Sequence, residues 1–136
     1  MKRIMIGAML IASCANPFTQ PDALVLNYLP PFVAQGFSDV QACVGRPSHV
    51  QFAQLTFLQV NAETFPGSRG QDVAGHAEFD GRVWIAAPYL GERSAWLWKH
   101  EMAHVMYRVS DHPADIFHRC ILMPSQQGVD LWLALR

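Results

Sequence analysis

Apolar residues recur at helical spacing in the first half of the chain. From Phe32 to Val44 they fall about one helical turn apart, and Gly45 then follows as a residue suited to end a helix. A helix is therefore predicted over this range. The preceding apolar stretch from Asp22 to Leu29 predicts a first, shorter helix. It ends before Pro30-Pro31 because proline lacks a backbone donor and restricts the residue before it.

The middle of the chain has patterns typical of strands. The run from Val50 to Val60 is rich in Phe, Leu, Thr and Val and predicts a strand, and residues 61–75 predict a loop. Asp80-Gly81 lies between two further short runs, 76–79 and 82–86. Asp-Gly favours a type I′ turn with positive φ at both residues, so a β-hairpin is predicted here.

The strongest helix signal lies from Glu92 to Val109. This range has no Gly or Pro and is dominated by good helix formers. Residues 110–113 break the pattern, a short segment follows over 114–120, and an apolar element is expected over 129–135. These elements predict an α+β domain in which a short mixed or antiparallel sheet packs on the helix from Glu92 to Val109.

The first residues have the layout of an export signal. Lys2 and Arg3 precede nine apolar or small residues, and Ser13-Cys14 follow. The sequence Ile-Ala-Ser-Cys at the end of this stretch resembles the bacterial lipobox, in which the Cys becomes lipidated. We expect a lipoprotein signal over residues 1–13, a lipid anchor on Cys14, and an exported protein attached to the cell-envelope membrane. A secretory signal cut after Ala15 is the alternative, and it also exports the protein.

Composition limits what the remaining residues form. The chain has 136 residues, of which 51% are hydrophobic and 15% charged, so residues 14–21 predict a linker and residues 22–136 a single domain. A net charge of −1 provides no basic surface for nucleic acid. The N-terminal apolar run is too short to cross a bilayer as a helix of ~20 residues, which excludes a polytopic membrane protein.

Two cysteines remain once Cys14 is assigned to the signal. In an oxidising compartment Cys43 and Cys120 are expected to pair, so a Cys43–Cys120 disulfide is predicted. Two buried free thiols are the alternative.

The residues with a chemical signature lie on the predicted helix. His100-Glu101-Met102-Ala103-His104 is an H-E-x-x-H motif. Residues four apart share one helix face, so both imidazoles are able to bind one Zn²⁺, with Glu101 beside them. The alternative is a pair of ordinary surface or core histidines.

A catalytic zinc needs a third protein ligand and a position left to water. No Glu follows Glu101, which excludes a site with a downstream glutamate ligand. We favour His112, because Pro113 biases it toward extended backbone and lets the chain turn back toward the metal. Asp111 and His118 remain alternatives.

These motifs resemble those of the zincin metallopeptidases, particularly metzincin-type and snapalysin-like sites. The resemblance rests on the H-E-x-x-H motif, on Asp111-His112-Pro113 and on the segment Cys120-Ile121-Leu122-Met123-Pro124, and the layout is also similar to that of small bacterial lipoproteins. It implies a zincin-like domain with His100, His104 and His112 as zinc ligands, Glu101 as general base and Met123 as the residue of a methionine turn. In metzincins the third ligand follows the second His by six residues, whereas His112 follows His104 by eight.

The expected function is that of a zinc-dependent hydrolase, a metallopeptidase of the bacterial cell envelope that acts on a peptide or protein substrate. Glu101 would take a proton from the attacking water and deliver it to the leaving amine. The strand from Arg82 to Ala87, if exposed at a sheet edge, would hold an extended peptide, and a plain structural strand is the alternative. Two non-catalytic alternatives are a structural zinc held by four ligands and an inactive zincin scaffold that binds a partner.

Overall fold

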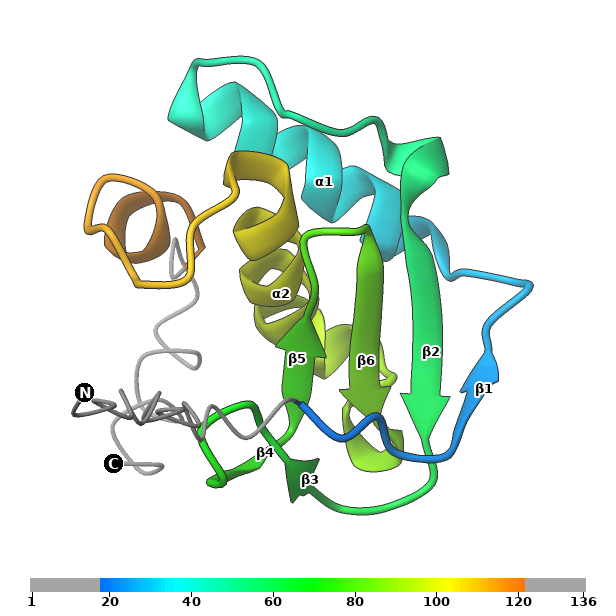
Figure 1. The fold of residues 1–136 in the computed structure, drawn as a ribbon. Coiled ribbons are helices and arrows are strands. Elements are labelled where there is room, and N and C mark those ends of the chain that lie inside the picture. The colour runs from blue at the N-terminus through cyan, green and yellow to red at the C-terminus, as the bar shows by residue number, and fades with distance from the viewer. Residues whose placement is uncertain (1–17, 122–136) are drawn as a thin grey trace, which may run out of the picture.

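The apolar run Val83 to Ala86 lies at the centre of a mixed four-stranded sheet (Figure 1). The computed structural model describes residues 18–121, and its strand order is β1-β2-β6-β5. β2 and β6 are parallel, whereas β1 and β5 are antiparallel to their neighbours at the two edges. The strands are β1 (Ala23–Val25), β2 (Thr56–Val60), β5 (Gly75–Ala77) and β6 (Arg82–Ala86), and β3 (Phe65–Pro66) and β4 (Asp72–Val73) form a separate pair.

Two helices, α1 (Pro31–Val44) and α2 (Ala95–Tyr107), pack on one face of this sheet (Figure 1). Their buried side chains meet those of Phe57, Val83 and Ile85 in the main hydrophobic core. The opposite face of the sheet carries a smaller cluster around Trp84. The predicted α+β class with a mixed sheet is therefore confirmed, and the helices and core lie mainly on one side of the sheet.

The predicted helix from Phe32 to Val44 is confirmed as α1, which ends at Gly45 with φ 73°. The prediction of a helix over Asp22 to Leu29 is wrong, since Ala23–Val25 forms β1 and pairs with β2. An isolated helix of this length is marginal, whereas a neighbouring strand satisfies the backbone groups of an extended segment. The strand expected from Val50 starts only at Thr56, because Phe52–Gln54 forms a 3₁₀ turn.

The helix signal from Glu92 to Val109 is divided in the structure. Glu92–Ser94 forms a 3₁₀ turn, α2 follows as Ala95–Tyr107, and Arg108 ends it in the left-handed conformation with φ 52°. The remaining short helical elements are a 3₁₀ turn over Ala87–Tyr89 and a π-helical turn over Phe117–Ile121.

The predicted hairpin is confirmed, but its turn type is wrong. β5 and β6 pair antiparallel, with Ala77 opposite Val83. The Gly81 N–H donates to the Glu78 carbonyl and the Glu78 N–H to the Arg82 carbonyl, and of Asp80 and Gly81 only Gly81 has positive φ. This is the three-residue loop with a glycine bulge instead of a type I′ turn. A side chain at Gly81 would also meet the Gln54 carbonyl oxygen at 2.7 Å.

The hypothesis that β6 is an exposed edge strand is wrong. β6 pairs with β2 on one side and with β5 on the other, so the edge next to α2 is formed by β5. The sequence pattern could not distinguish these strands, because a hairpin makes either of its two strands a candidate for the edge.

The Cys43–Cys120 disulfide is present, which overturns the alternative of two free thiols. It links the last turn of α1 to the π-helical turn Phe117–Ile121. Several expectations lie outside the described residues: the signal over residues 1–13, Cys14, the first part of the linker, Met123 and the apolar element over 129–135. Over residues 18–121 no helix is both long enough and apolar enough to cross a membrane.

Candidate metal centre

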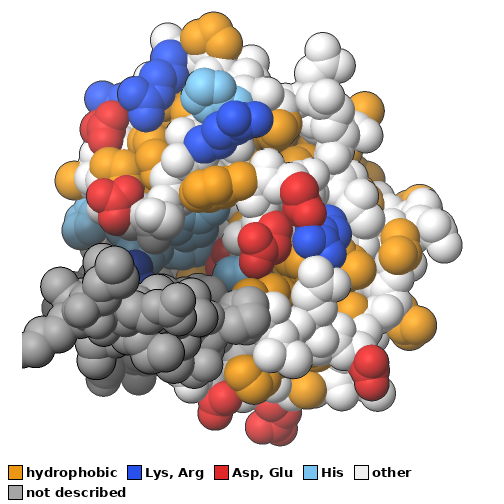
Figure 2. Space-filling model, in the orientation of Figure 1, with side chains coloured by type: hydrophobic (Ala, Val, Ile, Leu, Met, Phe, Trp, Pro, Cys, Tyr) orange, Lys and Arg blue, Asp and Glu red, His pale blue; other side chains and the backbone are white. Residues whose placement is uncertain are grey.

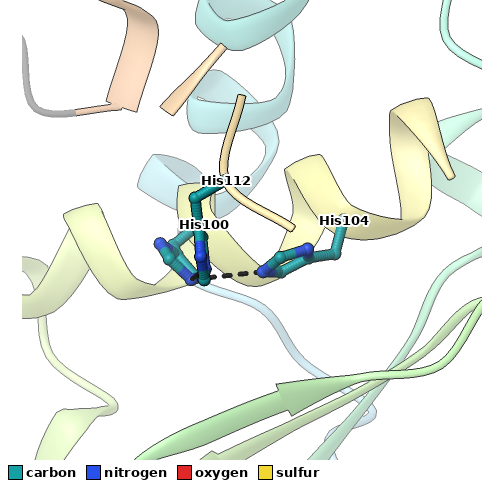
Figure 3. A group of neighbouring side chains, drawn as sticks. All are labelled: His100, His104 and His112. Atoms are coloured by element: carbon teal, nitrogen blue, oxygen red, sulfur yellow. Dashed lines mark hydrogen bonds between the residues drawn. The ribbon is translucent and has the colours of Figure 1, made fainter. Parts of the chain in front are cut away.

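Helix α2 places His100 and His104 on one face, one turn apart (Figure 3). The helix contains no Gly or Pro, and its opposite face buries Met102, Val105 and Met106 in the main core. Burial of that apolar face fixes the rotation of the helix about its axis, so the two imidazoles must point away from the core and toward the cleft described below.

His112 reaches the same place because the chain reverses directly after α2. Arg108 is left-handed, and the Val109 N–H donates to the His104 carbonyl at 3.2 Å. The chain then runs back along the helix, and Figure 3 shows the His112 side chain pointing toward His100 and His104. The structure thus supports His112 among the three proposed third ligands.

The three imidazoles converge through their Nε2 atoms. Nε2 of His100 lies 3.2 Å from that of His104 and 3.1 Å from that of His112. One ligand atom from each residue lies within 4.8 Å of the others, so these three residues are positioned to bind a metal ion. Asp111 and His118 do not belong to this group within residues 18–121.

The tautomer of His104 is fixed by the backbone. Its Nδ1 lies 2.6 Å from the Val109 carbonyl oxygen, and because a carbonyl only accepts, Nδ1 must donate. The lone pair of His104 is therefore on Nε2, which faces His100. A hydrogen bond from Nδ1 to a backbone carbonyl commonly orients metal-binding histidines.

Burial disfavours the charged form of His100 and His104. The pKa of His100 is lowered to about 3, mainly by burial and in addition by His104 and His112, because a second positive charge nearby is unfavourable. Burial also lowers the pKa of His104. Neutral imidazoles are the form that binds metal ions, so His100 and His104 are ready to coordinate at neutral pH.

Glu101 lies beside the three imidazoles and is nearly inaccessible, with 6% of its surface exposed. Burial raises its pKa to about 8. Its side chain packs against β5 at Gly75, where an added Cβ would lie 2.8 Å from both Cγ and Oε1 of Glu101. A glycine is needed at this position because the carboxylate occupies the space that any other side chain would fill.

Phe117 completes the centre, and its role was not predicted from the sequence. Its ring centroid lies 4.9 Å from His100, 4.7 Å from His104 and 4.8 Å from His112. An apolar residue in a short segment carries no signal for such contacts. The one hint in the sequence is that Phe117 precedes a disulfide cysteine by three residues.

The centre opens into a cleft of about 490 Å³ between β5 and the segment after α2. One wall contains Gly75 to Phe79 and the β3–β4 loop, and the other contains Val109 to His112. Figure 2 shows histidine side chains beside a hollow in this face, with acidic side chains near its rim. The three histidines and Glu101 therefore lie at the base of an open groove, where a ligand has access to them.

Comparison of the chain with protein-family models, with curated proteins and with solved structures finds no match. The geometry of the centre itself is therefore what points to a function for this chain.

Proposed function

We propose that this protein is a zinc-dependent hydrolase that cleaves peptide bonds. The observation that carries the proposal is the convergence of three imidazole nitrogens next to a buried carboxylate in an open cleft. Nitrogens 2.0–2.1 Å from a tetrahedral zinc lie about 3.3 Å apart. Two of the three nitrogen separations in this chain, 3.1 and 3.2 Å, are close to that value, and all three nitrogens lie within 4.8 Å of one another, which supports a Zn²⁺ site.

When bound by His100, His104 and His112, Zn²⁺ would polarise a substrate carbonyl and make water more acidic. Glu101 is the base that accepts a proton from the attacking water and then donates it to the leaving nitrogen. Its burial suits both steps, because a carboxylate shielded from bulk water exchanges its proton with the reacting groups. Among residues 18–121 the group of metal-ligating residues consists of three histidines, and it lies beside the cleft, which supports an open fourth position.

The free edge of β5 supports a peptide as the substrate. Among the described strands β5 pairs only with β6, so its outer backbone groups face the cleft beside Glu101. An extended peptide is able to add to such an edge through main-chain hydrogen bonds, which would bring a scissile bond over the imidazoles. Such an arrangement would be zincin-like. The signal expected over residues 1–13 and a lipid expected on Cys14 support the cell envelope as the proposed location of this activity.

The test combines metal content with proteolysis. Purified protein should contain about one zinc per chain and cleave an unfolded protein substrate, and a chelator should abolish cleavage. Glu101→Gln should retain zinc but lose about 10²- to 10⁴-fold in kcat/KM. His118→Ala is the control, because it changes an exposed histidine outside the group of three, and it should retain both zinc and activity. Loss of zinc in His118→Ala would favour the four-ligand structural site, and full activity of Glu101→Gln would refute the proposed base.

A further inference from the structure

The ring of Phe117 contacts all three imidazoles of the centre, yet it comes from neither α2 nor the loop that carries His112. It is 3% exposed and belongs to the π-helical turn Phe117–Ile121. Its contacts with His100, His104 and His112 are nearly equal, with centroid distances between 4.7 and 4.9 Å. Phe117 therefore supports the three rings together.

The turn that carries Phe117 is attached to a different helix. Cys120 is bonded to Cys43 in the last turn of α1, and Nη2 of Arg119 donates to the Cys43 carbonyl at 3.2 Å. Backbone hydrogen bonds from Phe117 to Pro113 and from Cys120 to Ile116 make the turn one continuous unit. The disulfide thus lies one helical turn from the ring that contacts the imidazoles.

His112 depends on this unit more than the other two ligands do. His100 and His104 are fixed by α2, whereas His112 is exposed and lies between two anchored points. On one side Val109 is hydrogen-bonded to His104, and on the other side Pro113 begins the turn that contains Phe117. The apolar ring of Phe117 packs against the imidazole of His112 and holds it toward the other two.

We propose that the Cys43–Cys120 disulfide and Phe117 form one positioning clamp that keeps His112 in the metal centre. The ligand concerned is a divalent cation, and the proposal depends on the three-histidine group and not on the hydrolysis proposed above. Residues that orient ligands affect metal affinity by about 10- to 100-fold when they are changed. The clamp should therefore be visible as metal affinity even if the protein hydrolyses nothing.

The decisive experiment compares two matched substitutions in the full chain. Phe117→Leu removes the ring beneath the imidazoles, and Phe57→Leu removes an equally buried ring of the same core that contacts Phe52 and Trp98. Zn²⁺ affinity is measured by competition with a chromophoric chelator, and the visible spectrum of bound Co²⁺ reports the ligand geometry. We expect about 10- to 100-fold weaker binding and an altered Co²⁺ spectrum for Phe117→Leu, against a change of less than about threefold for Phe57→Leu. Equal affinities in the two variants would show that Phe117 is only a core residue.

The disulfide is tested with Cys43→Ser/Cys120→Ser, which introduces no metal-binding thiols. It should also weaken Zn²⁺ binding about tenfold or more. Adding Phe117→Leu to this pair should cost little further affinity, because contacts that act through one another are not additive. Unchanged affinity in the serine pair, or losses that simply add, would overturn the single clamp.

Variants of low stability are still informative. The rise in unfolding midpoint with Zn²⁺ measures affinity for the folded form even when part of the protein is unfolded. Phe117→Met, which nearly fills the same volume, replaces Phe117→Leu if the latter does not fold and should bind Zn²⁺ more weakly than Phe57→Leu does. A serine pair that stays unfolded at saturating Zn²⁺ would show that the disulfide acts on the whole domain and not on the centre, and would overturn its part in the clamp.

Discussion

Helix α2 and the segment from Arg108 to Ile121 contribute to one centre, but they hold their residues in different ways. α2 supplies His100, Glu101 and His104 from five consecutive positions, and its apolar face sets their direction. The later segment contains one short π-helical turn and is held by a left-handed residue, a disulfide and buried side chains. A local motif is thus completed by a segment whose position depends on contacts made far along the chain.

Substitutions in these two regions should therefore affect the centre in different ways. Changes in α2 should act on the chemistry of the site directly, since helix geometry keeps the neighbouring ligands in place. Changes in the segment from Arg108 to Ile121, other than at His112 itself, should act through stability and positioning.

Removal of the disulfide should have the largest effect on stability. Cys43 and Cys120 are 77 residues apart, and closing a loop of that size in the unfolded chain contributes about 4 kcal/mol by the chain-entropy relation. Cys43→Ser/Cys120→Ser should lower the free energy of unfolding by about this amount, measured by urea denaturation of the metal-free protein. A loss below about 1 kcal/mol would mean that buried side chains alone hold the segment.

Removal of one imidazole distinguishes the two regions by metal affinity. His104→Ala and His112→Ala should each weaken Zn²⁺ binding by more than about 100-fold, beyond the effect of a residue that only orients ligands. The loss should be greater for His104→Ala, because that residue also holds Val109 and hence the start of the following segment. Chelator competition measures both values, and a larger loss in His112→Ala would contradict the dependence of the segment on α2.

Gly75→Ala tests the wall of the cleft opposite the segment. The new Cβ would lie 2.8 Å from the Glu101 side chain, so Glu101 or β5 must move, at a cost of about 1–3 kcal/mol in stability. We expect kcat to fall while Zn²⁺ affinity changes little, because the three atoms nearest the new Cβ all belong to Glu101 and none to an imidazole. Gly36→Ala in α1 is the control. Its Cβ would meet only flexible side-chain atoms of Lys99 and Met102, so stability should stay unchanged or rise.

The pH dependence of the free energy of unfolding of the metal-free protein reports on the titration of Glu101. Its pKa is about 8 in the folded chain against an ordinary 4.5, so folding favours its protonated form and stability should fall as pH rises from 4.5 to 8. His100, with a pKa of about 3 against 6.5, acts in the opposite direction below pH 6.5, where stability falls as pH decreases. Of these two residues, only Glu101 changes the stability between pH 6.5 and 8.

Urea unfolding in the presence of a chelator should therefore show a loss of up to about 2 kcal/mol between pH 6.5 and 8. Glu101→Gln is uncharged at every pH and should remove most of this decrease. The same slope in both proteins would mean that another group titrates in this range.

Several features could be predicted from the sequence because they depend on residues close together in the chain. The spacing of His100 and His104 defines a shared helix face in any context, and the apolar period from Phe32 to Val44 defines α1. Cys43 and Cys120 were the two cysteines left to pair, and they do. The turn at Asp80-Gly81 was predicted as a hairpin for the same local reason, although the added residue in its loop was not.

Other features were decided only by the tertiary structure. The order of strands determines that β5 and not β6 forms the edge beside the centre, because pairing partners far apart in sequence have no local signature. The choice of His112 over Asp111 and His118 depends on how Arg108 reverses the chain and where the disulfide holds it. Phe117 lies beneath the imidazoles only because α1 and α2 pack against the same turn. The sequence by itself determined which atoms were available to bind a metal, and the packing of distant segments determined which of them meet.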